Sequence, residues 1–355
     1  MIVLVRLQKI IFEKRAQLML GFLLLIIGCD KSKNLLVVEG NTMGTTYTVK
    51  IVDDVEKLNS IEIKNIIDSV LVIVNKQMST WDPNSEISKF NRWQSVSPFK
   101  VSYPFYKVVK SAINISEKTN GMFDVTVYDL MSLWGFGPNP KSGIPDKNSI
   151  ESLLFYTGYK NIKCEQGMII KTNPRTKLDL NSIAKGYGVD NVYENLKNIG
   201  FENIFVEIGG ELRFSGVNEK NRMWSVGLEN PPSDISNSQV PFFGILKNNS
   251  CAIATSANYR NIVDIDGTIL GHTINPMTGF PIQTDVLSVT VIAEKCMTAD
   301  AWATVLMTLD YASGLELLQK NSGINAIWVV KESDGNRSIA VHGSCNILDP
   351  IFPIK

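Results

Sequence analysis

The chain has 355 residues, of which 44% are hydrophobic and 20% are charged, as in ordinary folded proteins. This composition excludes a disordered chain, a collagen-like repeat and a membrane protein of many spans. Because 35 basic residues balance 35 acidic ones, the chain lacks the basic excess that bulk nucleic-acid binding requires, and no nucleic-acid partner is expected. The length allows one large domain or two closely packed ones.

The N-terminus departs from this average and predicts export. Four basic residues within the first 15 precede an uncharged apolar run over 18–28, which is too short to span a bilayer. Residues 1–28 resemble a bacterial lipoprotein signal peptide, with Cys29 as the lipidated first residue of the mature chain. The alternative is an uncleaved signal anchor in which Cys29 is incidental. Cleavage would leave 31 basic and 34 acidic residues, a net charge of −3.

A polar tether over 29–36 is expected to follow the lipidated cysteine. Beyond it, alternating apolar and polar residues predict strands and a turn within Val37–Asp53. Apolar residues at helical spacing predict helices over Ser60–Met78 and Tyr103–Thr119. A loop rich in proline and glycine is expected over Pro138–Pro145.

The second half of the chain alternates predicted helices and strands. A helix is expected over Ala184–Ile199, closed by Gly200, and short strands over about 203–253. Four further elements are predicted: a strand over Val286–Ala293, helices over Thr298–Leu309 and Ala312–Gln319, and a strand over Ala326–Lys331. No repeat or linker divides the mature chain, which predicts one α+β body of mixed sheets with flanking helices.

Four cysteines follow Cys29. They have neither C-x-x-C spacing nor histidines at ligand spacing, so a zinc site is not expected. Export would permit disulfides, but the sequence does not pair these residues, and free thiols are an equal alternative. The residues are Cys164, Cys251, Cys296 and Cys345.

Several segments in the first half have residue types typical of a ligand site. Thr42–Thr45 combine a glycine with small hydroxyl residues, which lets backbone approach a ligand, although a plain β-turn is the alternative. Trp81, in a polar loop, can stack on a planar ligand or cover the edge of the core. Asp124 lies between apolar residues and should accept hydrogen bonds from a ligand or the backbone. The aromatic and glycine residues of Leu133–Gly137 suit a loop beside a flat ligand.

Three features of the second half point to phosphate and metal chemistry. In Leu178–Asp190 a strand end precedes a helix start, whose free N–H groups suit phosphate, and Lys185 adds a donor; a capped helix with a solvated lysine is the alternative. His272, one of two histidines, is flanked by small polar residues and can accept a proton near neutral pH. Asp300 and Thr304 share one helix face and can hold a hard divalent cation, unless Asp300 merely complements the helix dipole.

Taken in order, these segments resemble the ApbE family, the FAD:protein FMN transferases. The similarity extends from about Thr42 to Leu309. It rests on the motifs MGT, ST-W-x-P-x-SEIS, G-x-FD-x-T, LWGFG, DLNSIAKGYGVD, IGGEL, ATSA-x-Y, GH-x-INP-x-TG-x-P and AD-x-x-AT. Many members of this family are exported lipoproteins, in agreement with the interpretation of Cys29. The resemblance implies an ApbE-like fold, related to the T-fold, over 37–355.

The resemblance also implies the reaction: cleavage of FAD at its pyrophosphate, transfer of FMN to a Thr or Ser hydroxyl of a partner protein, and release of AMP, with Mg²⁺ required. Mg²⁺ would be bound by the Ser182 carbonyl, the Asp300 carboxylate and the Thr304 hydroxyl. The catalytic residues would be Asp300 and His272, which would accept the proton of the acceptor hydroxyl. The implied FAD contacts are Met43, Trp81, Met122, Phe123, Asp124, Asp179, Lys185 and Ile274.

Three positions depart from the family's usual residues. Trp81 replaces a frequent Tyr, which should preserve stacking, and Ala257 replaces a frequent Gly. Asn275 replaces a frequent Asp before Pro-x-Thr-Gly, so a negative charge near the metal or the acceptor is absent, with an expected effect on rate or cation affinity rather than on the type of reaction.

Two other functions fit the same sequence: a Mg²⁺-dependent FAD pyrophosphatase, in which water is the attacking group, and a flavin-binding lipoprotein without catalysis. The acceptor is expected to be an exported or membrane-associated flavoprotein with a Thr/Ser motif. The expected location is the periplasmic face of the inner membrane of a Gram-negative bacterium, through a lipid anchor.

Overall fold

The structure is a computed structural model that describes residues 34–53, 58–232, 241–257, 259, 262–265, 268–271, 273–282 and 284–355. An eight-stranded sheet lies at its centre, and every neighbouring pair of strands is antiparallel. In spatial order the strands are β1 (Asn34–Thr42), β2 (Thr45–Asp53), β6 (Asn203–Ile208), β7 (Glu211–Ser215), β10 (Ser250–Ala257), β13 (Val286–Ala293), β14 (Asn325–Lys331) and β15 (Arg337–His342).

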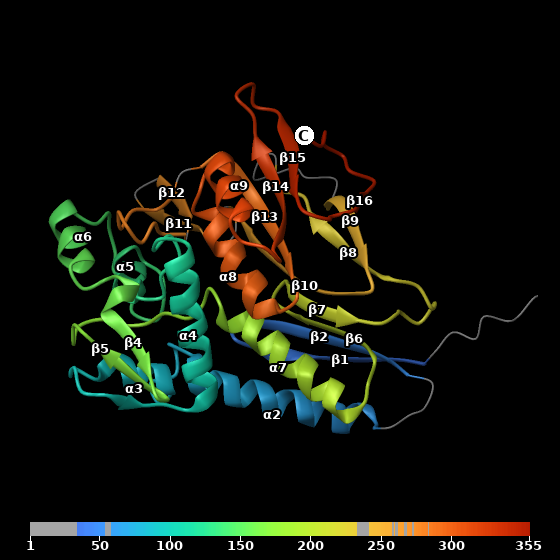
Figure 1. Ribbon diagram of the computed structural model, residues 1–355, viewed down its shortest axis with the longest axis horizontal. Coiled ribbons are helices and arrows are strands. Elements are labelled where there is room, and N and C mark those ends of the chain that lie inside the picture. The colour runs from blue at the N-terminus through green and yellow to red at the C-terminus, as the bar shows by residue number, and fades with distance from the viewer. Residues whose placement is uncertain are drawn as a thin grey trace, which may run out of the picture.

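Helices cover one face of this sheet (Figure 1): α2 (Ser60–Met78), α7 (Ala184–Ile199), α8 (Cys296–Met307) and α9 (Tyr311–Gln319). The start of α2 is fixed by a capping box, in which the Asn59 side chain accepts the Glu62 amide and the Glu62 side chain accepts the Asn59 amide. Apolar residues of α2 recur every three or four positions and are buried: Ile63, Ile67, Leu71, Val74 and Met78.

The opposite face of the sheet is covered by a second antiparallel sheet in the order β16 (Ile347–Leu348), β9 (Phe242–Asn248) and β8 (Trp224–Glu229). Large apolar side chains from both sheets form one cluster there, among them Phe214, Trp224, Phe243 and Val329. Both faces of the central sheet are therefore buried, which explains why residues at successive positions are buried in strands such as β13, Ser288 and Thr290 included.

A smaller lobe lies beside the central sheet, at the left of Figure 1. Its helices are α3 (Glu86–Arg92), α4 (Tyr103–Lys118), α5 (Tyr128–Leu133), α6 (Lys147–Leu154) and the 3₁₀ turn η1 (Tyr159–Asn161). Its sheet has the order β3 (Phe99–Lys100), β5 (Met168–Lys171) and β4 (Ile162–Glu165), and a separate hairpin is formed by β11 (Ile262–Ile265) and β12 (Thr268–Gly271).

Most predicted elements are confirmed, three of them residue for residue: the helices over 60–78 and 184–199 and the strand over 286–293. The helix predicted over 298–309 both begins and ends two residues earlier. The tether expected over 29–36 is wrong for its last three residues. β1 already begins at Asn34, because Leu35 and Leu36 pair with β2 opposite Val52 and Ile51.

The segments expected to direct export lie outside the described residues, which exclude 1–33 and therefore Cys29. In the part of the chain that is described, no helix is long and apolar enough to cross a membrane. The four remaining cysteines are free thiols: Cys164, Cys251, Cys296 and Cys345.

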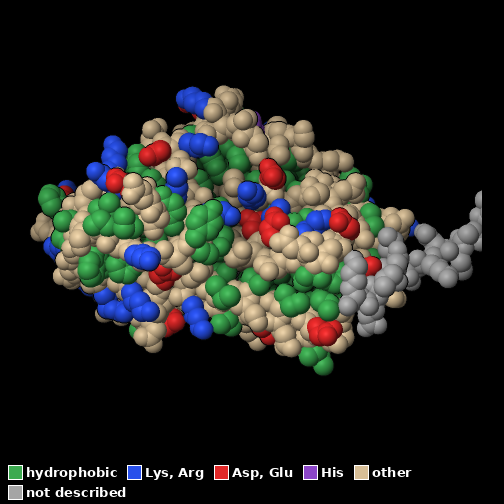
Figure 2. All heavy atoms as spheres, turned by 60° about the horizontal axis from the view of Figure 1, so that its bottom comes forward, with side chains coloured by type: hydrophobic (Ala, Val, Ile, Leu, Met, Phe, Trp, Pro, Cys, Tyr) green, Lys and Arg blue, Asp and Glu red, His purple; other side chains and the backbone are tan. Residues whose placement is uncertain are grey.

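Charges of both signs are mixed on one face of the molecule. On the face shown in Figure 2, acidic and basic side chains intermingle with apolar ones. This face therefore presents no continuous basic surface to a polyanion. Two of the most exposed large apolar side chains are Tyr103, at 75%, and Phe155, at 84%.

A buried lysine links the small sheet to α3. Lys171, in β5, is only 1% exposed. Its Nζ donates to the Trp93 carbonyl at 2.8 Å and lies 4.6 Å from the centre of the Phe90 ring. Burial, together with the charge of Lys177, lowers the pKa of Lys171 from 10.5 to about 8, against the opposing effect of Asp129.

We predict that Lys171 makes the protein more stable as the pH rises from about 8 to about 10.5. The folded pKa is below the unfolded one, so the unfolded chain binds more protons in this window and the free energy of unfolding increases with pH. Lys171→Met should flatten this part of the stability profile, measured by urea unfolding at several pH values. Lys163→Met, on the exposed side of β4, removes the same charge and should keep the wild-type profile. An unchanged slope in Lys171→Met would contradict the prediction.

Candidate active site

The candidate site is centred where the start of α7 meets α8. In a regular helix the Gly186 amide would donate to the Ser182 carbonyl four residues earlier. Here it donates to Oδ2 of Asp300 at 2.8 Å. The residue before α7, Ile183, provides no side-chain cap, and within the described residues no donor reaches the Ser182 carbonyl. The Ser182 carbonyl oxygen, just before α7, is therefore left without a hydrogen-bond donor in the described part of the chain.

The two helices approach so closely because residue 186 is a glycine. A Cβ at Gly186 would lie 2.4 Å from the Cys296 carbonyl oxygen and 2.8 Å from Cβ of Asp300. One turn further along α7, Asp190 accepts the amide of Cys296 and, from Arg213, a guanidinium N–H at 2.8 Å. Asp190 thereby caps the start of α8 and fixes both helices in one relative position.

A group of three charges lies next to this contact. Lys185 Nζ donates to Oε1 of Glu211, the first residue of β7. Burial alone would lower the pKa of Lys185, but the negative charges of Glu211 and Asp300 raise it above its usual value. Burial raises the pKa of both carboxyl groups, against the opposing charge of Lys185. Two buried carboxylates face one ammonium, so a further cation would be stabilised here.

The oxygens present suit a hard divalent cation. Asp300 offers a carboxylate and Ser182 a carbonyl, while Thr304 Oγ1 makes only a long contact of 3.4 Å to the Asp300 carbonyl of its own helix. The predicted placement of Asp300 and Thr304 one turn apart on a helix is confirmed. Among the described residues, no cluster of three or more His, Cys, Asp and Glu side chains could hold a metal. A site at Asp300 would therefore depend on neutral oxygens as well.

Two further segments meet beside the start of α7. The Asp179 amide donates to the Val125 carbonyl at 2.7 Å, so residues 123–125 and 178–180 lie side by side. Asp124 is buried and accepts hydrogen bonds from the amide and hydroxyl of Thr126 and from the Tyr159 amide. The prediction that Asp124 accepts hydrogen bonds is confirmed, with protein donors. Burial raises the pKa of Asp124 and Asp179 alike.

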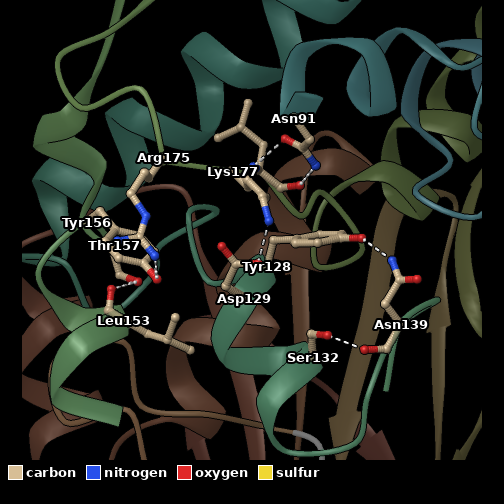
Figure 3. Close-up of polar contacts among 11 residues, drawn as sticks. Asn91, Tyr128, Asp129, Ser132, Asn139, Leu153, Tyr156, Thr157, Arg175 and Lys177 are labelled. Carbon is tan, nitrogen blue, oxygen red and sulfur yellow. Dashed lines mark hydrogen bonds and ion pairs between the residues drawn. The ribbon is translucent and has the colours of Figure 1, made fainter. Parts of the chain in front are cut away.

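The segment that carries Asp179 is held from two sides, as Figure 3 shows. Asn91 of α3 donates to the Leu178 carbonyl at 2.8 Å and accepts the Leu178 amide at 2.7 Å, like a neighbouring strand. Lys177 forms an ion pair of 2.8 Å with Asp129 of α5. These contacts fix the backbone of residues 177 and 178, which lead into the turn before α7.

The loop that follows the aromatic and glycine run is tied to α5 (Figure 3). Ser132 donates to the Asn139 carbonyl, and the Asn139 side chain donates to the Tyr128 hydroxyl at 3.1 Å. Trp134 is buried, and its Nε1 donates to the Gly279 carbonyl at 2.7 Å. This loop is thus joined to the 273–282 segment.

The predicted FAD-contacting residues differ in how far a ligand can reach them. Trp81 is 66% exposed and free to stack on a planar group. Met43 lies in the turn between β1 and β2, with its Cε 2.8 Å from where a Cβ of Gly188 would be. Phe123 is 1% exposed and packs in the core. Ile274 is also buried, against α5 and Trp134, whereas Met122 is half-buried.

The 273–282 segment borders a cavity. Asn275 Oδ1 accepts the amides of Met277 and Thr278, a turn that an aspartate would form equally well. His272, the predicted base, lies outside the described residues. A cavity of about 260 Å³ is lined by Asn275, Thr278, Pro281, Ile282, Thr284, Thr308, Leu309 and Asp310.

Sequence reasoning missed the roles of Gly186 and Glu211. Both lie inside recognised motifs, but Glu211 is 26 residues from Lys185 and belongs to a strand, so spacing did not connect them. The one local signal is the pair Gly209-Gly210, both with positive φ, which turns the chain tightly into β7.

A helix start without a side-chain cap, with a lysine and beside oxygens suited to a divalent cation, is an arrangement that suits a phosphate-bearing ligand. The profile of the ApbE family matches residues 43–328, and the chain belongs to this family. The expected ApbE-like α+β fold is confirmed by a solved flavin transferase ApbE from Vibrio cholerae, which superposes with a TM-score of 0.80 at 38% identity and covers 88% of this chain and 97% of that one.

Curated relatives of similar sequence carry the name of the same enzyme family. A Vibrio cholerae protein named FAD:protein FMN transferase is 39% identical over 322 residues, which are 90% of this chain and 95% of the relative. A protein of the same name from Haemophilus influenzae is 35% identical and covers 87% of this chain and 90% of its own length.

We predict that Gly186→Ala separates α7 from α8. The added methyl group would meet the Cys296 backbone, which cannot yield, and overpacking of this kind costs about 1–3 kcal/mol. Gly188→Ala is the matched control, because its methyl group would meet the flexible end of Met43 and, at an ordinary contact distance, the side chain of Ile208. Thermal unfolding should show a lower midpoint for Gly186→Ala and an unchanged or higher one for Gly188→Ala. Equal midpoints for the two variants would contradict the prediction.

Proposed function

We propose that this protein is an FAD:protein FMN transferase. It would split FAD at the pyrophosphate, attach FMN through its phosphate to a Thr or Ser hydroxyl of another protein, and release AMP. Membership of the ApbE family supports this reaction. The observation that carries the proposal is the placement of Lys185 and Asp300 at the uncapped start of α7, where the charge of a pyrophosphate can be neutralised.

Lys185 would bind the pyrophosphate oxygens through its ammonium and through its backbone amide, the one amide in the first turn of α7 that has no acceptor among the described residues. These two donors are fixed before the ligand arrives, by Glu211 and by the contact of Gly186 with α8. Preorganised donors of this kind stabilise charge that develops during the reaction, without reorganisation at that moment. On cleavage, negative charge grows on the phosphate of the departing AMP.

Ser182, Asp300 and Thr304 would hold Mg²⁺, and their oxygens fit it. When bound, Mg²⁺ supplies Lewis-acid neutralisation of the phosphate oxygens. The Gly186 amide fixes the orientation of the Asp300 carboxylate through Oδ2. The start of α7 and the proposed metal ligand are therefore positioned together.

In the transfer step, the acceptor hydroxyl oxygen would attack the phosphorus of the FMN half. The new P–O bond forms as the bond from this phosphorus to the bridging oxygen breaks, and AMP leaves with the bridging oxygen. The hydroxyl proton has to be removed, and we assign this role to His272 on the basis of its motif. Attack by water at the same phosphorus would give FMN and AMP, the pyrophosphatase reaction.

We further propose that Cys29 is lipidated and anchors the protein at the periplasmic face of the inner membrane. The signal-like sequence over 1–28 supports this location. Only residues 30–33 separate Cys29 from β1, and five residue steps span at most about 18 Å. The catalytic body would then lie close to the membrane and reach acceptors associated with it.

The reaction predicts an FMN adduct. The purified protein, incubated with FAD, Mg²⁺ and an exported flavoprotein that has an exposed Thr/Ser motif, should increase the mass of the acceptor by one FMN less water. Free FMN and AMP without an adduct would instead indicate the pyrophosphatase. Intact bound FAD with neither product would indicate a flavin-binding protein and contradict the proposal.

The assignment of the base predicts that His272→Ala lowers transfer by about 10²–10⁴-fold, the usual contribution of a general base, and leaves FAD affinity unchanged. The matched control is His342→Ala, which changes the only other histidine and should retain full transfer. Parallel loss of FAD binding and transfer in His272→Ala would contradict the assignment.

A further inference from the structure

We propose that Glu211 is a positioning residue, which holds the Lys185 ammonium toward the pyrophosphate of FAD and so gives the site its preference for FAD over flavins without a pyrophosphate. This inference rests on the proposed function, because it takes FAD as the ligand. It assigns Glu211 no contact with FAD of its own.

The rigid partner of the pair is Glu211. It begins β7, inside the eight-stranded sheet, and its backbone pairs with Ile208 of β6. Lys185 lies at the second residue of α7 and reaches Glu211 through a flexible chain with four rotatable bonds. The carboxylate therefore sets the position of the ammonium.

The exposure of the two side chains differs in the way that a positioning role requires. The Glu211 side chain is 5% exposed, while that of Lys185 is 32% exposed. An ammonium has three donors, and one of them is used by Oε1 of Glu211. The carboxylate of the pair is thus shielded from solvent, whereas the ammonium is accessible and Lys185 can donate to a ligand.

The Glu211 carboxylate is dedicated to this lysine. Its second oxygen, Oε2, is buried and has no hydrogen-bond partner, and in the described part of the chain no other side chain donates to Glu211. A buried carboxylate oxygen without a partner is costly. A purely structural ion pair gains stability by using both oxygens, as Asp190 does with two amides and Arg213. Glu211 instead has its effect through a single contact with Lys185.

The experiment compares the affinities for FAD and riboflavin, by flavin fluorescence, without an acceptor protein. Glu211→Leu should weaken FAD binding at least about tenfold and leave riboflavin binding unchanged. Glu211→Gln keeps an oxygen in place and should retain part of the FAD affinity, and it also serves if the leucine variant does not fold. Glu207→Gln, at the other end of the Gly209-Gly210 turn, is the matched control and should change neither affinity.

A double-mutant cycle separates positioning from a direct role. If Glu211 acts through Lys185, Lys185→Met combined with Glu211→Leu should bind FAD no more weakly than Lys185→Met alone. Additive losses would overturn the proposal, because Glu211 would then act independently, for example on a cation. Equal losses of FAD and riboflavin affinity would also overturn it and indicate a structural role. A wild-type protein that binds no FAD would refute the proposed function itself, which is a distinguishable result.

Discussion

The close contact between α7 and α8 is the constraint on which the site depends. It exists because Gly186 has no side chain, so that its amide reaches the Asp300 carboxylate at 2.8 Å. Because the Gly186 amide donates to Asp300 and not to the Ser182 carbonyl, this one hydrogen bond leaves that carbonyl free and orients the Asp300 carboxylate. Lys185, the residue before Gly186, donates to Glu211 at the first position of β7.

Two groups of buried charged side chains connect these helices to the sheet. They differ in how fully their carboxylate oxygens are hydrogen-bonded and their charges neutralised. Asp190 is satisfied by two amides of α8 and by Arg213, which makes it a structural tie. Lys185 is paired with Glu211 and also feels the charge of Asp300. One oxygen of Glu211 has no hydrogen-bond partner, and negative charge is in excess when all three groups are ionised. Buried charge must be compensated, so the group of Lys185, Glu211 and Asp300 is the one that favours binding of a cation and a phosphate.

Much of the fold follows from sequence periodicity and end signals. α7 was predictable from Ala184 to Gly200, since its apolar spacing and terminal glycine are local features. Asp300 and Thr304 were predictable as neighbours because four residues make one helical turn. The partnership of Lys185 with Glu211 was not, because it joins a helix to a strand through tertiary packing. The burial of Phe123 inside a ligand-like motif was missed for the same reason.

The central proposal is that Asp300, oriented by the hydrogen bond from the Gly186 amide, binds a divalent cation together with the phosphate ligand. Titration with Mn²⁺, followed by electron paramagnetic resonance in the presence of FAD, tests it without any turnover. Asp300→Asn keeps an oxygen for the Gly186 amide and removes the charge. We predict one tightly bound Mn²⁺ in the wild type and at least about tenfold weaker binding in Asp300→Asn, about 1.4 kcal/mol. Equal Mn²⁺ affinity in the two proteins would contradict the account.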